Sequence, residues 1–63
     1  MRDFKQGAEV IISDIGGVYI GKVHWVRENG IRIKDWTKKG GSKKVNINFL
    51  TFDVRDVWIE EII

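Results

Sequence analysis

The sequence contains no cysteine and no proline, and only one histidine among its 63 residues. The absence of cysteine excludes a disulfide framework and a thiolate metal site, and a single histidine excludes a histidine-rich zinc site. No apolar run approaches the roughly 18 residues that a membrane span needs. The charged start of the chain is not followed by an apolar stretch, so no signal peptide is expected and a cytoplasmic or nuclear location is the default.

The chain is short enough to form one domain, which is expected to span residues 1–63. Its hydrophobic fraction of 43% is ordinary for a globular protein. Eleven basic and nine acidic residues leave a net charge of +2, which permits a nucleic-acid partner without requiring one. A core of this size is small, so association with other chains would add stability.

Valine and isoleucine alternate with polar residues along most of the chain, which is the pattern of strands. The predicted strands are Glu9–Asp14, Val18–Arg27, Ile31–Trp36, Lys44–Leu50 and Val57–Ile62. Asn29-Gly30 predicts a type I′ hairpin turn, because both residues tolerate positive φ. Gly21 predicts a bend inside the second strand. Together these features predict an all-β, five-stranded, strongly bent SH3-like or Sm-like barrel, with a short helical turn at Met1–Gln6.

Basic residues gather between positions 32 and 44 and predict a nucleic-acid site. Trp36 is expected on the same outward face as Arg32 and Lys34. Cations beside an exposed ring suit single-stranded nucleic acid, because the cations meet phosphates and the ring stacks on a base. The alternative interpretation is a solvated hairpin tip on which lysine prevents aggregation. The predicted nucleic-acid-binding residues are Arg32, Lys34, Trp36, Lys38, Lys39, Lys43 and Lys44.

The end of the chain is acidic, with Asp53, Asp56, Glu60 and Glu61 against Arg55 alone. Basic and acidic ends on one subunit favour head-to-tail association of copies, and ordinary surface charge is the alternative. The fourth predicted strand is expected to pair with a neighbour's fifth strand. The predicted oligomer interface consists of Val45, Ile47, Val57, Ile59 and Ile62.

Other chemistry has little support in the sequence. The aromatic rings could form a cage for a methylated cation, but core filling is the preferred interpretation. His24 has no nucleophile nearby in sequence, and the serines lie in no G-x-S-x-G motif. The chain has no phosphate loop, no dinucleotide fingerprint and no calcium loop. We therefore predict no enzyme, no cofactor and no metal.

Short segments along nearly the whole chain resemble the Sm and Lsm family of small barrels. Those similar to the family's first three strands are Gly7–Val10, Gly17–Val23, with its bend-permitting glycine, and Ile31–Asp35, with its closing acidic residue. Thr51–Val57, followed by Ile59 and Ile62, resembles the end of the divergent Lsm domains of enhancer-of-decapping proteins. The resemblance implies a five-stranded barrel that serves ribonucleoprotein assembly.

The chain departs from the family at both of its RNA-binding signatures. In the turn after the second strand, Arg27 stands where the family has aspartate, and Gly30 stands near its asparagine. Leu50–Asp53 replaces the family's Ile-Arg-Gly run. The family's uridine pocket is therefore not carried over, whereas subunit pairing through backbone groups is compatible with these changes.

The residues and the resemblance predict a non-enzymatic Sm/Lsm-like module that associates with RNA or RNA-associated proteins. It is expected to be a homo-oligomer joined through strand edges. The alternative is a Tudor- or SH3-like barrel that binds a peptide and no nucleic acid, and a third class is a barrel that binds duplex DNA. Salt dependence separates them, because phosphate contacts weaken steeply with salt and a peptide groove does not.

Overall fold

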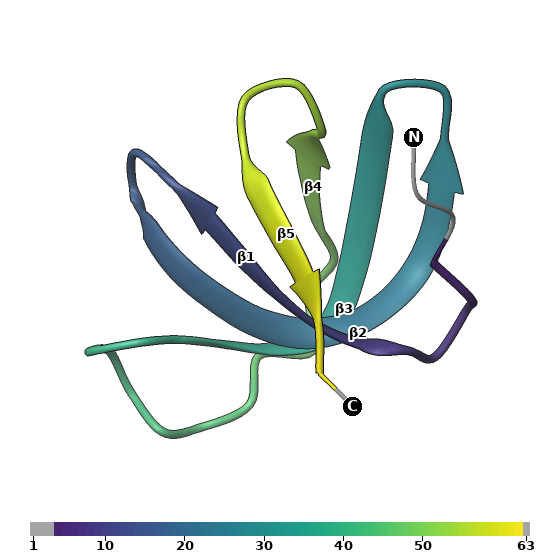
Figure 1. The fold of residues 1–63 in the computed structure, drawn as a ribbon. Helices are drawn as coiled ribbons and strands as arrows, with labels where there is room; N and C mark the ends of the chain where they lie inside the picture. The colour runs from purple at the N-terminus through teal and green to yellow at the C-terminus, as the bar shows by residue number, and fades with distance from the viewer. Residues whose placement is uncertain (1–3, 63) are drawn as a thin grey trace.

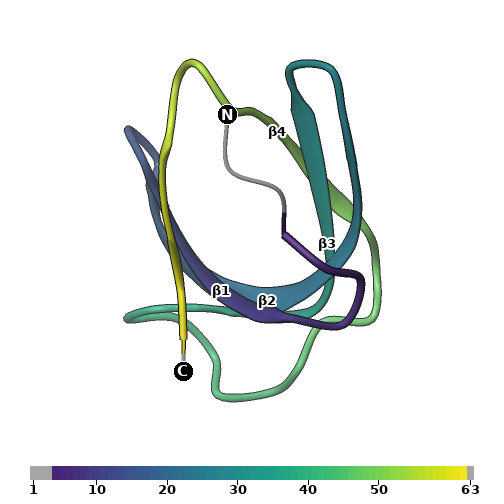
Figure 2. The ribbon, with the colours of Figure 1, turned by 45° about the vertical axis from the view of Figure 1, so that its right-hand side comes forward.

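A computed structural model describes residues 4–62, which form a single antiparallel sheet of five strands (Figure 1). The strands are β1 (Glu9–Asp14), β2 (Gly17–Arg27), β3 (Gly30–Lys38), β4 (Leu50–Asp53) and β5 (Trp58–Glu61). Their order in the sheet is β4-β3-β2-β1-β5. Although β4 and β5 follow each other in sequence, they therefore lie at opposite edges, joined by residues 54–57 (Figure 2).

The prediction of an all-β fold with five strands is confirmed, but the predicted closure into a strongly bent barrel is not found. In the described residues, β4 pairs with β3 and β5 pairs with β1, and no ladder joins β4 to β5. Each of these two strands has only four residues, all of them engaged along one edge. Because the free edges of β4 and β5 do not pair with each other, the sheet stays open.

No helical turn forms where the start of the chain is described. Residues 4–8 run as coil and turn, and Met1–Asp3 lie outside the described residues. Gly7 donates its N–H to the carbonyl of Val23 at 2.8 Å, and Val23 donates to the carbonyl of Ala8 at 2.8 Å. The segment lies beside β2 and uses its backbone groups there, which replaces the hydrogen bonds that a helix would make.

One face of the sheet carries the core. Apolar and polar residues alternate along β3, which predicts that Ile31 and Ile33 face inward. Both are fully buried. An open antiparallel sheet buries one face and leaves the other wet, which gives alternating apolar and polar residues along each strand. We call the wet side the outer face. The buried core residues are Val10, Ile12, Val23, Ile31, Ile33, Phe52 and Ile59.

The predicted fourth strand, Lys44–Leu50, is wrong. This segment contributes a single isolated bridge between Asn46 and Trp36, and its Ile47 side chain is 80% exposed. The observed β4 begins at Leu50, and its Phe52 packs in the core. Both stretches alternate, but they are offset by one residue, and a shift of one residue exchanges the two faces of a strand. The alternation alone could not decide which set would be buried.

The first irregularity in the β2–β3 ladder turns Trp36 toward the core. The register shifts between Ile20 and Lys22, where Asp35 adopts a φ of 49°. Such a bulge changes the side on which the following residues lie. The Trp36 side chain packs against the core instead of sharing the outer face with Arg32, as the alternation had predicted.

The second irregularity brings two neighbouring residues to the outer face. The register of β2 shifts between Val23 and Trp25. Val23 and Val26 both pack on the core side. His24 and Trp25, between them, both lie on the outer face, because a bulge inserts one extra residue into the alternation.

The β2–β3 hairpin differs from the predicted type I′ turn. Arg27 pairs with Gly30, so the turn residues are Glu28 and Asn29, and among the turn residues and Gly30 only Glu28 has a positive φ, of 48°. Gly30 begins β3, and a Cβ there would lie 3.4 Å from the Trp25 ring. The glycine thus gives the indole room to lie across the strand and does not supply a left-handed turn.

Gly21 is a position at which an added methyl group should destabilise the core, because it would meet packed atoms of β3. A Cβ there would lie 2.8 Å from the Cβ of Trp36 and 3.1 Å from both Ile33 Cδ1 and the carbonyl of Lys34. We expect Gly21→Ala to lower the free energy of unfolding by about 1–3 kcal/mol, as overpacking does. The control is Gly30→Ala, whose nearest contact is 3.4 Å. Equal denaturation midpoints for the two variants would contradict this packing.

Candidate nucleic-acid interface

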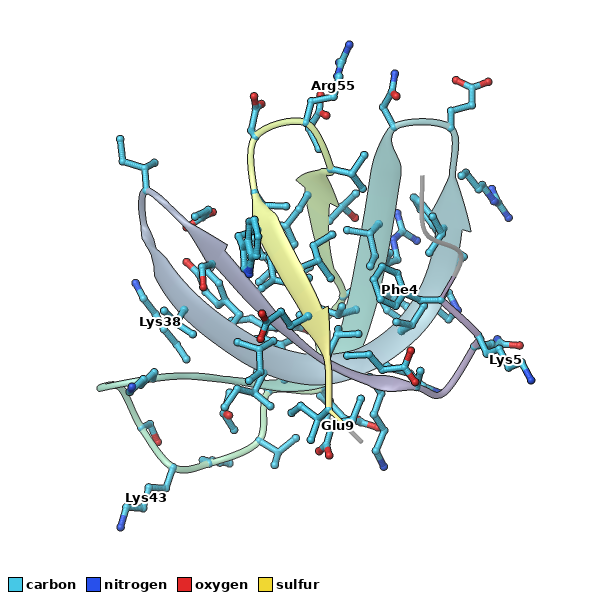
Figure 3. All side chains as sticks on the ribbon, viewed as in Figure 1. Phe4, Lys5, Glu9, Lys38, Lys43 and Arg55 are labelled. Carbon is cyan, nitrogen blue, oxygen red and sulfur yellow. The ribbon has the colours of Figure 1, made fainter. Side chains whose placement is uncertain are left out.

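Four of the predicted binding residues lie at the end of β3 and on the loop 39–49 that follows it. Lys38, Lys39, Lys43 and Lys44 are all exposed. Lys43 points away from the sheet (Figure 3). The loop has defined turns: Gly40 has a φ of 83°, and Gly41 donates its N–H to the carbonyl of Lys38 at 3.0 Å. The loop therefore presents its lysines to solvent.

Trp36 fastens this loop to the sheet. Its Nε1–H donates to the carbonyl of Asn48 at 2.7 Å. Its backbone exchanges hydrogen bonds with Asn46 at 2.8 and 3.1 Å. The ring meets Tyr19 edge-on at a centroid distance of 5.7 Å. The structure therefore places Trp36 apart from Arg32 and Lys34, as a side chain that holds the loop in place.

The outer face of β2 and β3 brings together cations and rings that the alternation did not group. The guanidinium carbon of Arg32 lies 4.8 Å from the centroid of the Trp25 ring and 5.3 Å from that of Phe49. Arg32 Nε also donates to the hydroxyl of Thr51 at 3.1 Å. The guanidinium carbon of Arg27 lies 5.0 Å from the same Trp25 ring. One indole therefore interacts with two arginines.

His24 extends this group of planar side chains. Its ring stacks on Phe49 with a centroid distance of 4.4 Å and an angle of 21° between the planes. Its Nδ1 is buried and has no hydrogen-bond partner. A cleft of about 540 Å³ opens beside these residues. Its lining residues are Phe4, Gln6, His24, Trp25, Val26 and Arg27.

The cations of the outer face form no ion pairs in the part of the chain that the structure describes. Lys22 lies directly opposite Lys34 in the β2–β3 ladder, and like charges in that position destabilise a sheet. Glu9 lies opposite Lys22 in the β1–β2 ladder, but the only ion pair within residues 4–62 joins Asp53 and Arg55. Arg27, Lys22 and Lys34 are therefore free of ion pairs to any described residue, which suits an anionic partner.

The predicted residues fall into two groups. Arg32 and Lys34 belong to the outer face, whereas the remaining lysines belong to the loop. The sequence pattern did not identify Trp25, Arg27 and Phe49 as neighbours of Arg32. Phe49 lies in the predicted strand Lys44–Leu50, and it is 53% exposed. The second bulge has no glycine to mark it, so the sequence pattern did not group these rings.

The predicted oligomer interface is divided between surface and core. Val45, Ile47 and Ile62 are exposed. Ile59 is only 8% exposed and Val57 packs against the core, so these two side chains stabilise the sheet itself. The reason is register: Ile59 lies opposite Ile12, the central core residue of β1. The exposed apolar residue of β5 is Trp58, the neighbour of Ile59, at 66%.

Metal ligands do not gather in the described part of the chain. Within residues 4–62, no three side chains of histidine, aspartate or glutamate lie together as a metal site would need. The same residues contain no helix that would reach across a membrane.

Comparison of the chain with protein-family models, with curated proteins and with solved structures gives no match. Short segments of the sequence resemble the Sm and Lsm family, but these comparisons identify no family and no homologue. What is established is a small protein with one five-stranded antiparallel sheet.

Hydrogen bonds in the turn between β4 and β5 should lower the pKa of one carboxyl group, that of Asp53. Arg55 donates from Nη2 and Nε to Asp53 at 2.6 and 3.0 Å, and from its backbone N–H at 2.9 Å. These side-chain and backbone hydrogen bonds, assisted by the guanidinium charge, lower the pKa of Asp53 from 3.8 to about 2. The stability that this interaction contributes is complete above pH 3.8 and is lost as the pH falls through about 2.

Carbon-detected NMR of the Asp53 carboxyl group is the measurement that checks this shift. In Arg55→Ala the midpoint should move back toward 3.8, whereas Lys5→Ala should leave it unchanged. A midpoint that is the same in wild type and Arg55→Ala would contradict the assigned cause.

Proposed function

We propose that this protein is a non-enzymatic binding module that associates with RNA or with RNA-associated proteins. The observation that carries the proposal is the concentration, on the outer face and the adjoining loop, of cations that form no ion pair among the described residues. Lysine and arginine neutralise phosphates, and this electrostatic term supplies most of the affinity of sequence-independent binding. The chain keeps these charges although Lys22 and Lys34 repel each other across the ladder.

Kinship with the Sm and Lsm family is part of the proposal. The strand number, the antiparallel pairing and the close contact at Gly21 in β2 support it. The changes at Arg27 and Gly30 argue against the family's uridine pocket. Binding is therefore proposed to depend on backbone phosphates and on the surface cations: Arg32, Lys34, Lys38, Lys39, Lys43 and Lys44.

Self-association through strand edges is the second part of the proposal. β4 and β5 end the sheet on opposite sides, so each has a side without a neighbouring strand of the same chain. The exposed apolar residues Ile47, Trp58 and Ile62 lie on the loop before β4 and at β5. Glu60 and Glu61 on β5 would attract the lysines of a neighbour's loop. Because the contact joins two different surfaces, its repetition leads to a ring.

A peptide-binding module is the second candidate function. The exposed apolar side chains of Val45, Ile47 and Phe49 favour it, because exposed apolar patches mark protein contacts. The salt dependence of binding separates it from RNA binding, because a peptide groove makes few contacts to charged phosphates.

The loop lysines should govern the salt dependence of RNA binding. Replacing Lys38, Lys39, Lys43 and Lys44 by glutamine should weaken binding of a fluorescein-labelled oligouridylate. It should also flatten the slope of log affinity against log salt by about 0.7 for each phosphate that the variant no longer neutralises. Fluorescence anisotropy between low and physiological salt measures both quantities. Lys5→Gln and Lys43→Gln form a matched pair of single changes, of which only the second should weaken binding.

Absence of binding by the wild-type protein at low salt would rule out the RNA-binding proposal. The peptide-binding module would then take its place. A shallow salt dependence for a bound ligand would point the same way.

The assembly should be visible as a mass above 7.3 kDa in light scattering at tens of micromolar. Ile47→Asp should reduce the mass toward that of the monomer, because it places a charge in the proposed contact. Ile15→Asp is the matched control, since Ile15 is fully exposed in the turn between β1 and β2 and belongs to neither edge strand. A monomeric wild-type protein, or equal masses for the two variants, would contradict assembly through this surface.

A further inference from the structure

The outer face contains a continuous series of five planar groups. His24 stacks on Phe49 at 4.4 Å, and Phe49 lies 5.3 Å from the guanidinium of Arg32. Arg32 lies 4.8 Å from Trp25, which lies 5.0 Å from Arg27. The members come from β2, β3 and the residue before β4. Guanidinium planes stack on nucleobases as aromatic rings do, so the exposed members Phe49 and Arg27 can extend the stack onto bases.

Local geometry orients these side chains on the outer face. The bulge after Val23 turns both His24 and Trp25 outward, and Gly30 leaves the space in which the indole lies. The hydroxyl of Thr51 fixes Arg32 by accepting its Nε–H at 3.1 Å. The series is therefore held in place before any ligand arrives, which reduces the entropy lost on binding.

The charge of this surface suits phosphodiesters. Neither Arg27 nor Arg32 forms an ion pair within residues 4–62. Lys22 and Lys34 lie opposite each other on the same face, two residue pairs along the ladder from Arg32. A strand whose bases stack on the planar groups would bring phosphates to these four cations and relieve their mutual repulsion. The cleft beside Trp25 and Arg27, about 540 Å³ in volume, offers room next to the stack.

We infer that the series His24, Phe49, Arg32, Trp25 and Arg27 is a stacking site for unpaired bases of single-stranded nucleic acid. The inference rests on the proposed function and specifies its ligand. Bases in a duplex already stack on each other and keep their faces inaccessible, whereas bases of a single strand are free to stack on protein. Duplex binding and peptide binding are the competing outcomes. Trp36, on the other face, takes no part.

The test measures how the affinity for single-stranded RNA changes when a planar group of this site is removed while the positive charge is kept. The probe is a fluorescein-labelled decauridylate, and a blunt duplex of the same length serves as competitor. Trp25→Leu removes the indole and should weaken binding roughly 5- to 150-fold, the range found for one stacked base. Arg32→Lys keeps the charge but removes the planar group, and it should also weaken binding. Arg55→Lys makes the same exchange of guanidinium for ammonium in the turn between β4 and β5, outside the site, and should bind as wild type does.

Intrinsic tryptophan fluorescence gives a second measurement that needs no substitution within the stacking site. Binding of unlabelled decauridylate should quench the fluorescence of the wild type and of Arg55→Lys to a similar extent. The duplex should cause little quenching. Circular dichroism melts establish that each variant is folded before its affinity is compared.

The outcomes separate the stacking site from the proposed function. If wild type binds the strand but Trp25→Leu and Arg32→Lys bind as tightly as Arg55→Lys, the stacking site is wrong and the proposed function stands. Equal affinity for duplex and single strand would overturn the inference in the same way. If wild type binds neither probe at low salt, the proposed function fails and the inference fails with it.

Discussion

The contact between Gly21 and β3 decides which side chains reach each face of this sheet. The two strands approach so closely there that a methyl group on Gly21 would meet the Cβ of Trp36 at 2.8 Å. The opposing strand bulges at Asp35, and Trp36 turns onto the core side. With Trp36 in that position, the loop 39–49 has an anchor through Asn46 and the carbonyl of Asn48. The location of the loop lysines thus depends on one glycine in β2.

The two faces of the sheet differ in composition and in role. The core face holds the protein together through Val10, Ile12 and their neighbours. The outer face has no second layer to cover it, so residues there need not be apolar. Rings on this side are associated with arginines instead of with other apolar groups, as at Trp25 and Arg32. The proposed binding surface is thus the side of an open sheet that folding leaves uncovered.

The parts of the fold that follow from local chemistry were predictable from the sequence. Alternation located β1 with its observed bounds, and it placed Ile31 and Ile33 in the core. Asn29-Gly30 located the second hairpin, although its positive φ falls on Glu28. These features depend only on residues that are close in sequence, so the local pattern of the sequence is enough to predict them.

The rest depends on where strands meet, which no local pattern contains. Two bulges in one ladder reversed the expected face of Trp36 and brought Trp25 beside Arg32. β4 formed at Leu50–Asp53 because only that stretch pairs with β3 while placing Phe52 in the core. The alternating segment before it remained exposed. Basic residues were therefore identified from the sequence, but the rings that accompany them were not.

The loop 39–49 carries the proposed RNA-binding lysines and the proposed assembly residue Ile47 on one stretch of backbone. Trp36 is the main-chain and side-chain anchor of that stretch. Whatever orders the loop for one partner removes part of the conformational entropy that the other partner would otherwise have to remove. Occupancy by a nucleic acid and association of copies are consequently linked equilibria, and linkage acts equally in both directions. A long strand would promote its own coating by the protein, and dilution of the protein would release the strand.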